Sequence, residues 1–122
     1  MNIEISTSEE QEIRKSLEKR NDLEAKRLLR FLALPDLSRQ EGSPLKEIVD
    51  RTRGVRGLDG FDTIKIPEIV SVPILFDLFN MPSGHPARSK SDTYYVNEEY
   101  VLRTHDTVFW YYYLNHPAIQ ER

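Results

Sequence analysis

Prolines and glycines divide this sequence into short segments, and their positions limit every helix and strand to a modest length. Pro35 ends the first helical pattern, Pro44 stands where another begins, and Pro67 ends a strand pattern because proline cannot donate a hydrogen bond to a sheet. No run of about 18 apolar residues occurs, so no membrane-spanning helix is expected. Short helices that alternate with short strands predict an α+β fold, and 122 residues suit one domain.

Two helices are predicted before Pro35. Thr7 or Ser8 can cap the first, because a hydroxyl followed by an acidic first turn satisfies the free N–H groups of a helix start. Asn21, with Glu24 three residues later, can cap the second. The second helix has the cleaner apolar stripe, which consists of Ala25, Leu28, Leu29 and Leu32.

Charges of both signs are interleaved along these two helices. Seven basic and six acidic residues lie between Glu9 and Arg30. This pattern is typical of a solvated helix surface, which we favour over an RNA-facing surface. The formal net charge of -3 also excludes a strong uniform field for gripping nucleic acid, so any contact with RNA must be local.

A third helix and a strand are predicted in the middle of the chain. Ser43 followed by Pro44 places a cap before proline at the first helical position, where its missing N–H has no consequence. The helix should fray near Arg53, because three glycines follow closely and each weakens a helix. A strand over 61–66, with loosely alternating apolar residues, should then stop at Pro67.

Two more strands and a final helix are expected near the end of the sequence. The strands, 93–96 and 100–102, should form a hairpin through 97–99. Thr104 can cap the helix. The aromatic run over 109–113 must place some rings inside the fold and some outside.

The sequence offers little for metal binding or nucleophilic catalysis. It has no cysteine, which excludes disulfides and thiolate chemistry and is in keeping with a reducing cytoplasm. The three histidines, His85, His105 and His116, are never four residues apart as in a helical metal site, so no metal is expected. Ser89, His105 and Asp92 could form a hydrolase triad on paper, but no nucleophile elbow accompanies them.

The segment that starts at His85 is a polar loop leading into an aromatic strand. In an arbitrary sequence such a loop has only a structural role, with Arg88 pairing with a neighbour such as Asp92. In the same way, His105 just inside a helix start would most often cap or pack.

Three motifs nevertheless occur together and in order. They read His85-Pro86-Ala87-Arg88, then Asp92-Thr93-Tyr94-Tyr95, then Leu102-Arg103-Thr104-His105. This run resembles the signature of phenylalanyl-tRNA synthetase alpha subunits, in which a His-Pro-Ala-Arg loop precedes an Asp-Thr-aromatic strand and a Leu-Arg-Thr-His or Leu-Arg-Thr-Gln turn. The likeness extends upstream to Ser43-Pro44-Leu45, Gly60-Phe61, Pro67-Glu68-Ile69 and the segment 76–82.

The resemblance implies part of a class II synthetase fold. Residues 1–42 would be an N-terminal helical extension and linker, and 43–122 would be the front part of the catalytic domain with its antiparallel sheet. Pro67 would belong to motif 1, which builds the dimer interface in the family. His105 and Thr107 would approach the polar end of phenylalanine, and Ser91 holds a variable position that also lines this site in some members.

The resemblance also implies the cofactors and partners of a complete parent enzyme. That enzyme would work in the cytoplasm, would use ATP and Mg, and would bind phenylalanine, tRNA and a beta subunit. This sequence departs from the family after His105, where Asp106 and Thr107 stand in place of Thr-Ser, and it contains no motif 2 or motif 3, whose arginines hold ATP. We therefore expect a fragment that is inactive alone, has no cofactor of its own and self-associates through the motif 1 region. Two other interpretations stay open: a natural short paralogue that serves as a binding or dimerisation module, and an unrelated small domain. The coding sequence downstream of Arg122 would distinguish a fragment from a paralogue.

Overall fold

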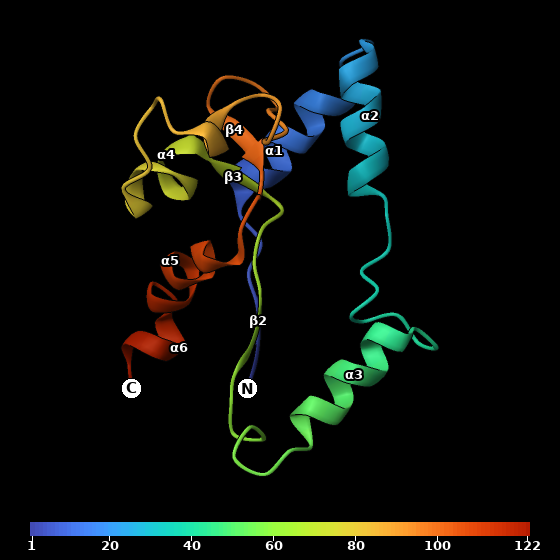
Figure 1. The fold of residues 1–122 in the computed structure, drawn as a ribbon, viewed down its shortest axis with the longest axis vertical. Helices are drawn as coiled ribbons and strands as arrows, with labels where there is room; N and C mark the ends of the chain where they lie inside the picture. Colours follow the sequence, from blue (N-terminus) through green and yellow to red (C-terminus); the bar gives the residue numbers. More distant parts are fainter.

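The structure, a computed structural model, describes all 122 residues and places short helices around two pairs of strands (Figure 1). The helices and strands are β1 (Asn2–Glu4), α1 (Ser8–Glu18), α2 (Leu23–Leu32), α3 (Pro44–Arg53), β2 (Thr63–Lys65), β3 (Ile69–Ser71), α4 (Val72–Leu75), β4 (Tyr100–Leu102), α5 (Phe109–Leu114) and α6 (Pro117–Gln120). Three 3-10 turns are η1 (Asp77–Phe79), η2 (Pro86–Arg88) and η3 (Asp106–Val108). This mixture confirms the α+β prediction. No helix is both long enough and apolar enough to cross a membrane.

The strands form two separate pairs. β3 and β4 are antiparallel, with Val70 opposite Val101, as the resemblance implies for this part of the chain. β1 and β2 are parallel, with Ile3 opposite Ile64. β1 was not predicted, because a three-residue strand with one apolar residue carries no readable alternation.

The helix starts follow local side-chain chemistry. Thr7, rather than Ser8, caps α1, and its Oγ1 accepts a hydrogen bond from the Glu10 N–H at 3.1 Å. Asp22, and not Asn21, caps α2 by accepting from the Ala25 N–H at 3.1 Å. The aspartate is the better cap because its negative charge suits a helix start.

The predicted third helix is confirmed at both ends. The Ser43 Oγ accepts from the Leu45 N–H at 3.2 Å, Pro44 is the first helical residue, and the helix ends at Arg53. The predicted strand over 61–66 is confirmed only for Thr63–Lys65.

Two expectations near the C-terminal part of the chain are wrong. Residues 93–96 do not form a strand; only Tyr95 makes an isolated bridge, to Val101. The hairpin is nevertheless partly formed, because the Val96 N–H donates to the Tyr100 carbonyl oxygen and the Leu102 N–H donates to the Tyr94 carbonyl oxygen, both at 2.9 Å. The hydroxyl of the buried Thr93 donates to the Ala87 carbonyl oxygen in the preceding loop. Thr104 does not cap the last helix either; His105 occupies the cap position of η3, which leads into α5.

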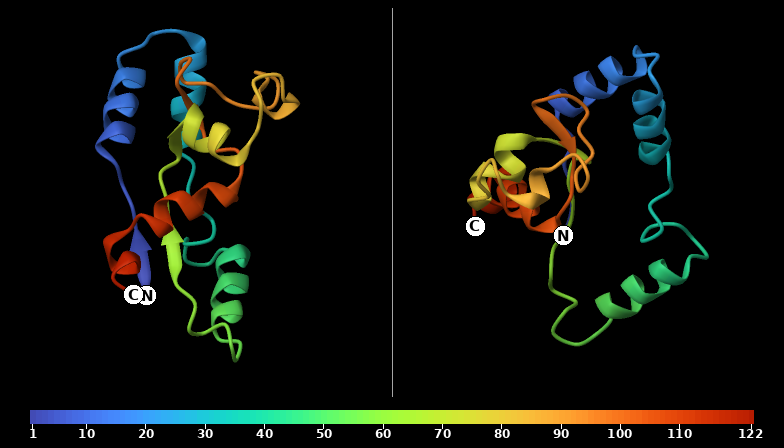
Figure 2. Two further views of the ribbon diagram at one scale, coloured as in Figure 1. Left: turned by 90° about the vertical axis from the view of Figure 1, so that its left-hand side faces the viewer. Right: turned by 45° about the horizontal axis from the view of Figure 1, so that its top comes forward.

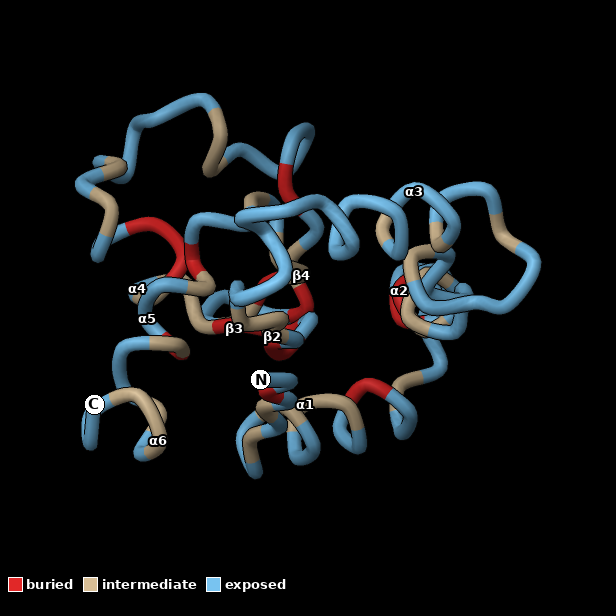
Figure 3. The backbone as a smooth tube through the Cα atoms, turned by 90° about the horizontal axis from the view of Figure 1, so that it is seen from below, coloured by how far each residue is buried: buried red, intermediate tan, exposed pale blue.

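The core lies on both faces of β3, because neighbouring residues of a strand point to opposite sides. Val70 belongs to one buried cluster, with Ile66, Leu75, Phe76, Val101, Val108 and Tyr112. Ile69 belongs to another, with Leu17, Ala25, Leu28 and Val96. In Figure 3 many of the buried segments lie around β3 and β4, and others lie on α1 and α2. The short sheet is thus covered by α1 and α2 on one side and by α4 and α5 on the other.

Direct hydrogen bonds also join the N-terminal helices to the rest of the chain. The Ile69 N–H donates to the Glu10 carboxylate at 3.0 Å, and the Arg20 guanidinium donates to the Val96 carbonyl oxygen at 2.6 Å. The predicted boundary between residues 42 and 43 therefore separates segments that pack together, because α1 and α2 of residues 1–42 cover the sheet formed by β3 and β4 of residues 43–122.

α3 lies apart from this core. The views in Figures 1 and 2 place it at the far end of the long connection between α2 and β2. None of its residues is buried, and its Leu45 and Ile48 are 48% and 61% exposed. This helix therefore carries an apolar face with no partner inside the chain.

Candidate functional site

The first signature motif forms a tight turn. Pro86, Ala87 and Arg88 make up η2, and the Nδ1 of His85 accepts a hydrogen bond from the Ala87 N–H at 3.1 Å. Proline suits the first position of such a turn because its fixed φ is already helical. His85 therefore acts here as a cap that shapes the loop.

Arg88 fixes this turn to the core. Its Nη1 donates to Asp77 Oδ1 at 2.7 Å and to the Met81 carbonyl oxygen at 2.8 Å, and its guanidinium lies 5.2 Å from the centre of the Phe76 ring. Asn80 has a left-handed φ of 57°, which asparagine tolerates, and it ends η1 just before Met81. The side chain of Arg88 thus joins η1 and η2.

The prediction that Arg88 pairs with Asp92 is therefore wrong. The chain brings η2 back beside η1, and the Arg88 guanidinium forms its ion pair with Asp77 of η1. Asp92 instead lies within 3.5 Å of the Ser91 hydroxyl.

The second motif is tied back to the first. The hydroxyl groups of Thr93 and Tyr95 donate to the carbonyl oxygens of Ala87 and Arg88 respectively. Thr93 is the one buried polar residue of the loop, at 3% exposure, and its bond leaves no polar atom unsatisfied. These contacts give the loop between η2 and β4 a defined shape.

The third motif contacts the motif 1 segment. The Arg103 N–H donates to the Glu68 carbonyl oxygen at 2.8 Å, and the Arg103 guanidinium lies 3.4 Å from Asp106. Pro67, the predicted interface residue, is buried within the chain, whereas Glu68 beside it is exposed. Any interface at motif 1 therefore needs the exposed neighbours of Pro67.

His105 and Thr107, the two residues expected to approach the polar end of phenylalanine, contact each other. The His105 Nδ1 and the Thr107 Oγ1 are 2.6 Å apart, and the His105 Nε2 is 2.9 Å from the Leu75 carbonyl oxygen. The Phe79 ring meets the imidazole edge-on, with centroids 5.4 Å apart. Both ring nitrogens and one face of His105 are thus held by the chain.

These contacts determine what the pair can offer a ligand. A carbonyl oxygen only accepts, so Nε2 of His105 carries a proton, and in the neutral ring Nδ1 accepts from the Thr107 hydroxyl. The lone pairs of the Thr107 oxygen then remain free to accept a hydrogen bond from a donor such as an ammonium group. Thr107 is exposed, so a ligand can reach it.

The remaining candidate residues do not join this pair. Ser91 lies 2.7 Å from Ser89, oxygen to oxygen, and has no hydrogen bond to His105 or Thr107. Ser89 has none to His105 either, so the structure does not assemble the triad of Ser89, His105 and Asp92. No group of three or more His, Asp or Glu side chains is placed to hold a metal ion.

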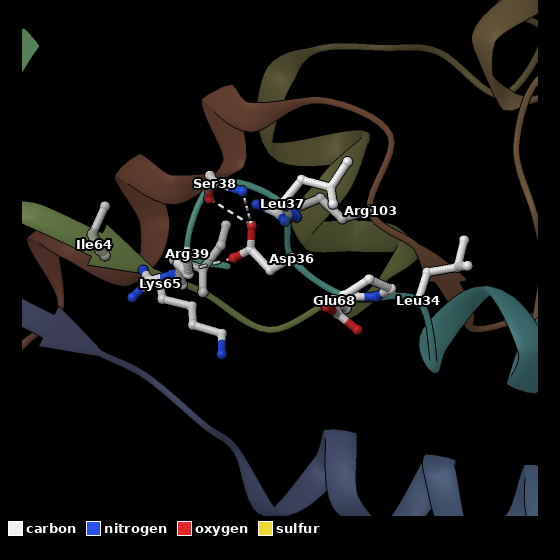
Figure 4. A pocket seen from close by; sticks show the side chains of 11 residues that line it. Leu34, Asp36, Leu37, Ser38, Arg39, Ile64, Lys65, Glu68 and Arg103 are labelled. Carbon is white, nitrogen blue, oxygen red and sulfur yellow. Dashed lines mark hydrogen bonds and ion pairs between the residues drawn. The ribbon is translucent and has the colours of Figure 1, made fainter. Parts of the chain in front are cut away.

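A polar pocket of about 430 Å³ opens beside Arg103 (Figure 4). One wall is the turn 34–39, and the other consists of residues 64–66 with Glu68 and Arg103. Within the turn, Asp36 accepts from the Ser38 N–H at 3.0 Å, and the hydrogen bond from the Ser38 hydroxyl is the main reason that the pKa of Asp36 is lowered. This turn falls in the predicted linker at the end of residues 1–42, and Asp-Leu-Ser-Arg is a recognisable turn signal.

Asp62 anchors α5 close to the strands β1 and β2. The Tyr113 hydroxyl donates to Asp62 Oδ2 at 2.6 Å, and the Arg122 guanidinium donates to the same oxygen at 2.8 Å. The hydrogen bond from Arg122, followed by that from Tyr113, holds the pKa of Asp62 well below its usual range. This cluster sets where the helix that follows Thr107 can lie.

Comparison with known proteins gives a consistent result. Residues 32–121 match the family described as tRNA synthetases class II core domain (F). Similar curated proteins include two phenylalanine–tRNA ligase alpha subunits. The one from Mycoplasmoides gallisepticum is 38% identical over 78 residues, which cover 62% of this chain and 23% of the relative. The one from Francisella tularensis subsp. novicida is 32% identical over 108 residues, which cover 86% of this chain and 29% of the relative. This chain therefore spans less than a third of the length of either relative. No solved structure matches it.

Proposed function

Since this chain belongs to the class II tRNA synthetase core domain family and is related to phenylalanine–tRNA ligase alpha subunits, we propose that it forms the front part of such a catalytic domain. The complete enzyme would activate phenylalanine with ATP and Mg and transfer it to tRNA, together with a beta subunit. The observation that carries the proposal is the pairing of His105 with Thr107 in the signature turn, inside the matched range.

In this proposal Thr107 receives the ammonium group of phenylalanine. The Thr107 hydroxyl donates to His105, so its oxygen presents lone pairs to an incoming N–H donor. His105 orients that hydroxyl and is itself oriented by the Leu75 carbonyl oxygen. Ser91 has contacts only within its own loop, and its proposed place beside the substrate rests on the resemblance alone.

The other signature residues would have a supporting role. Arg88 and Thr93 hold the loop after η1 through buried or half-buried bonds, and Arg103 joins the turn before His105 to the motif 1 segment. A binding group is effective only when its neighbours fix its position. The loop and turn would therefore keep His105 and Thr107 in place.

We further propose that the 122 residues alone do not activate phenylalanine. They contain no Phe-Arg-x-Glu motif and no glycine-rich motif with an arginine, so no group is present to stabilise the charge on the phosphates of ATP. Phenylalanine-dependent pyrophosphate exchange by the purified chain should equal that of a heat-treated control. Exchange above that control would refute the proposal.

A chimera tests the proposed function directly. In this chimeric alpha subunit, residues 32–121 replace the matching segment of the Mycoplasmoides gallisepticum alpha subunit, which is produced together with its own beta subunit. We expect phenylalanine-dependent pyrophosphate exchange. A chimera that folds and binds the beta subunit but shows no exchange would contradict the proposal, and an unmodified relative serves as the positive control.

Association with another protein surface is the last part of the proposal. The exposed apolar residues of α3 and of the connection after it, such as Ile48 and Phe61 at 61% and 68% exposure, favour burial against a partner. The partner would be a beta subunit or a second copy of the chain. Because Pro67 is already buried, α3 would supply most of the contact in place of the motif 1 segment.

A further inference from the structure

A group of basic residues on α2 and on the loop after η2 has no role in the site described above. Lys26, Arg27 and Arg30 lie on α2, and Lys90 lies in the loop; all four are exposed. None of them forms an ion pair, whereas cations such as Arg20 and Arg88 are each paired with a carboxylate. We call these four residues the α2 basic cluster.

Two aromatic rings hold Arg27 within this cluster. Its guanidinium carbon lies 5.5 Å from the centre of the Phe31 ring and 5.2 Å from that of Tyr94. The two rings are themselves in contact, at 5.1 Å between centroids. The Arg27 Nη2 also donates to the Tyr94 hydroxyl at 3.4 Å. The aromatic faces restrict the guanidinium without neutralising it, so Arg27 keeps its charge and its remaining N–H donors available for an anion.

The loop brings Lys90 to the same place. Arg27 and Lys90 both line a pocket of about 330 Å³, together with Glu24, Thr93, Tyr94 and Tyr95. Glu24 is its one acidic lining residue. Tyr94 is 40% exposed at this pocket, so an aromatic face stands beside two cations.

From this arrangement we infer that the α2 basic cluster and Tyr94 bind RNA. Unpaired, exposed Lys and Arg side chains neutralise phosphates, and an exposed aromatic ring beside them stacks on an unpaired base. The choice of RNA over another polyanion rests on the proposed function, which supplies tRNA as a substrate. The sequence alone favours a plain solvated surface on α2, because it does not show that Lys90 and Tyr94 lie beside Arg27.

The test is the affinity of the 122-residue chain for a tRNA transcript that accepts phenylalanine, measured by fluorescence anisotropy across salt concentrations. The variant replaces Lys26, Arg30 and Lys90 with alanine and leaves Arg27 and its packing intact. The control replaces Lys15, Arg53 and Arg56, which also have no ion pair, with alanine, so both variants have the same net charge. Circular dichroism checks that each is folded.

We expect the cluster variant to bind at least about tenfold more weakly at low salt. The slope of log affinity against log salt should fall by about 1 for each phosphate that the variant no longer neutralises. The control variant should bind like the parent chain. Glu24→Gln should bind more tightly, because it removes the one carboxylate of the pocket. Tyr94→Leu should bind about tenfold more weakly, whereas Tyr94→Phe keeps the ring and should bind nearly as well as the parent.

Three results would overturn the inference: equal weakening by the two triple variants, no binding of the transcript by the parent chain, or binding of phosphatidylserine vesicles in place of RNA. None of these would affect the proposed function, because pyrophosphate exchange by the chimeric alpha subunit requires no RNA. Conversely, loss of exchange with intact RNA binding would refute the proposed function and leave this surface established.

Discussion

Replacing Arg88 with alanine should destabilise the chain more than any other single change at its signature loop. The substitution removes a charged donor from the half-buried Met81 carbonyl oxygen, which alone costs about 1.5 to 3 kcal/mol. Removing the guanidinium from the Phe76 ring costs a further 0.5 to 1 kcal/mol, roughly. The ion pair with Asp77 adds less, because that carboxylate is 57% exposed and solvent screens it.

Because these terms share one side chain they do not simply add, and we expect a decrease of about 2 to 3 kcal/mol in the free energy of unfolding. Urea unfolding followed by far-UV circular dichroism measures it. Arg53→Ala is the matched control, since Arg53 is exposed and unpaired and should change stability by less than about 0.5 kcal/mol. Arg88→Lys keeps the charge but not the planar fork, so it should fall between them. A decrease no larger than that of the control would refute the assignment of Arg88 as the residue that joins η1 to η2.

Three further predictions concern acid, the core and association. Because the pKa of Asp62 is lowered in the folded chain, the stability that Asp62 contributes is fully present above its unfolded pKa of about 4 and is lost as pH falls from there through the lower folded pKa. The melting temperature of Asp62→Asn should therefore depend less on pH in that range than that of the parent chain. Equal pH dependence would count against the Asp62 cluster. Leu28→Ala should lower the free energy of unfolding, measured by urea denaturation, by about 2 to 5 kcal/mol, because Leu28 is fully buried against the sheet. A decrease below about 1 kcal/mol would show that α2 does not pack there. Light scattering should show self-association at high concentration that Ile48→Lys reduces; a monomer at all concentrations would argue against α3 as a contact surface.

Local chemistry made parts of this fold predictable. The Ser43-Pro44 helix start was readable because a cap and the proline that follows it act within one turn. The α1 start at Thr7 was readable for the same reason. The strand pair β1–β2 was not, because Ile3 and Ile64 are distant in sequence and only the folded chain brings them together.

The site shows the same division between local and distant contacts. Placing His105 beside Thr107 needed only a turn of two residues and the family resemblance. The Leu75 carbonyl oxygen that fixes the imidazole lies thirty positions earlier, and no sequence pattern points to it. Asp77 could not be foreseen as the partner of Arg88 either, because the chain passes through the left-handed Asn80 before η2 comes back beside η1.

The Michaelis constant for phenylalanine, measured beside that for ATP in the chimeric alpha subunit with its beta subunit, tests the central claim most directly. In His105→Ala, Thr107 loses the acceptor that orients its hydroxyl, which weakens its hydrogen bond with the ammonium group of phenylalanine. A hydrogen bond to a charged group typically contributes about 1.5 to 3 kcal/mol, so the constant for phenylalanine should rise by up to about tenfold to a hundredfold, and the constant for ATP should stay the same. Thr107→Ser keeps the hydroxyl and should retain most of the affinity, whereas Thr107→Val should not. An unchanged phenylalanine constant in His105→Ala, with a normal melting temperature, would remove His105 from the substrate site.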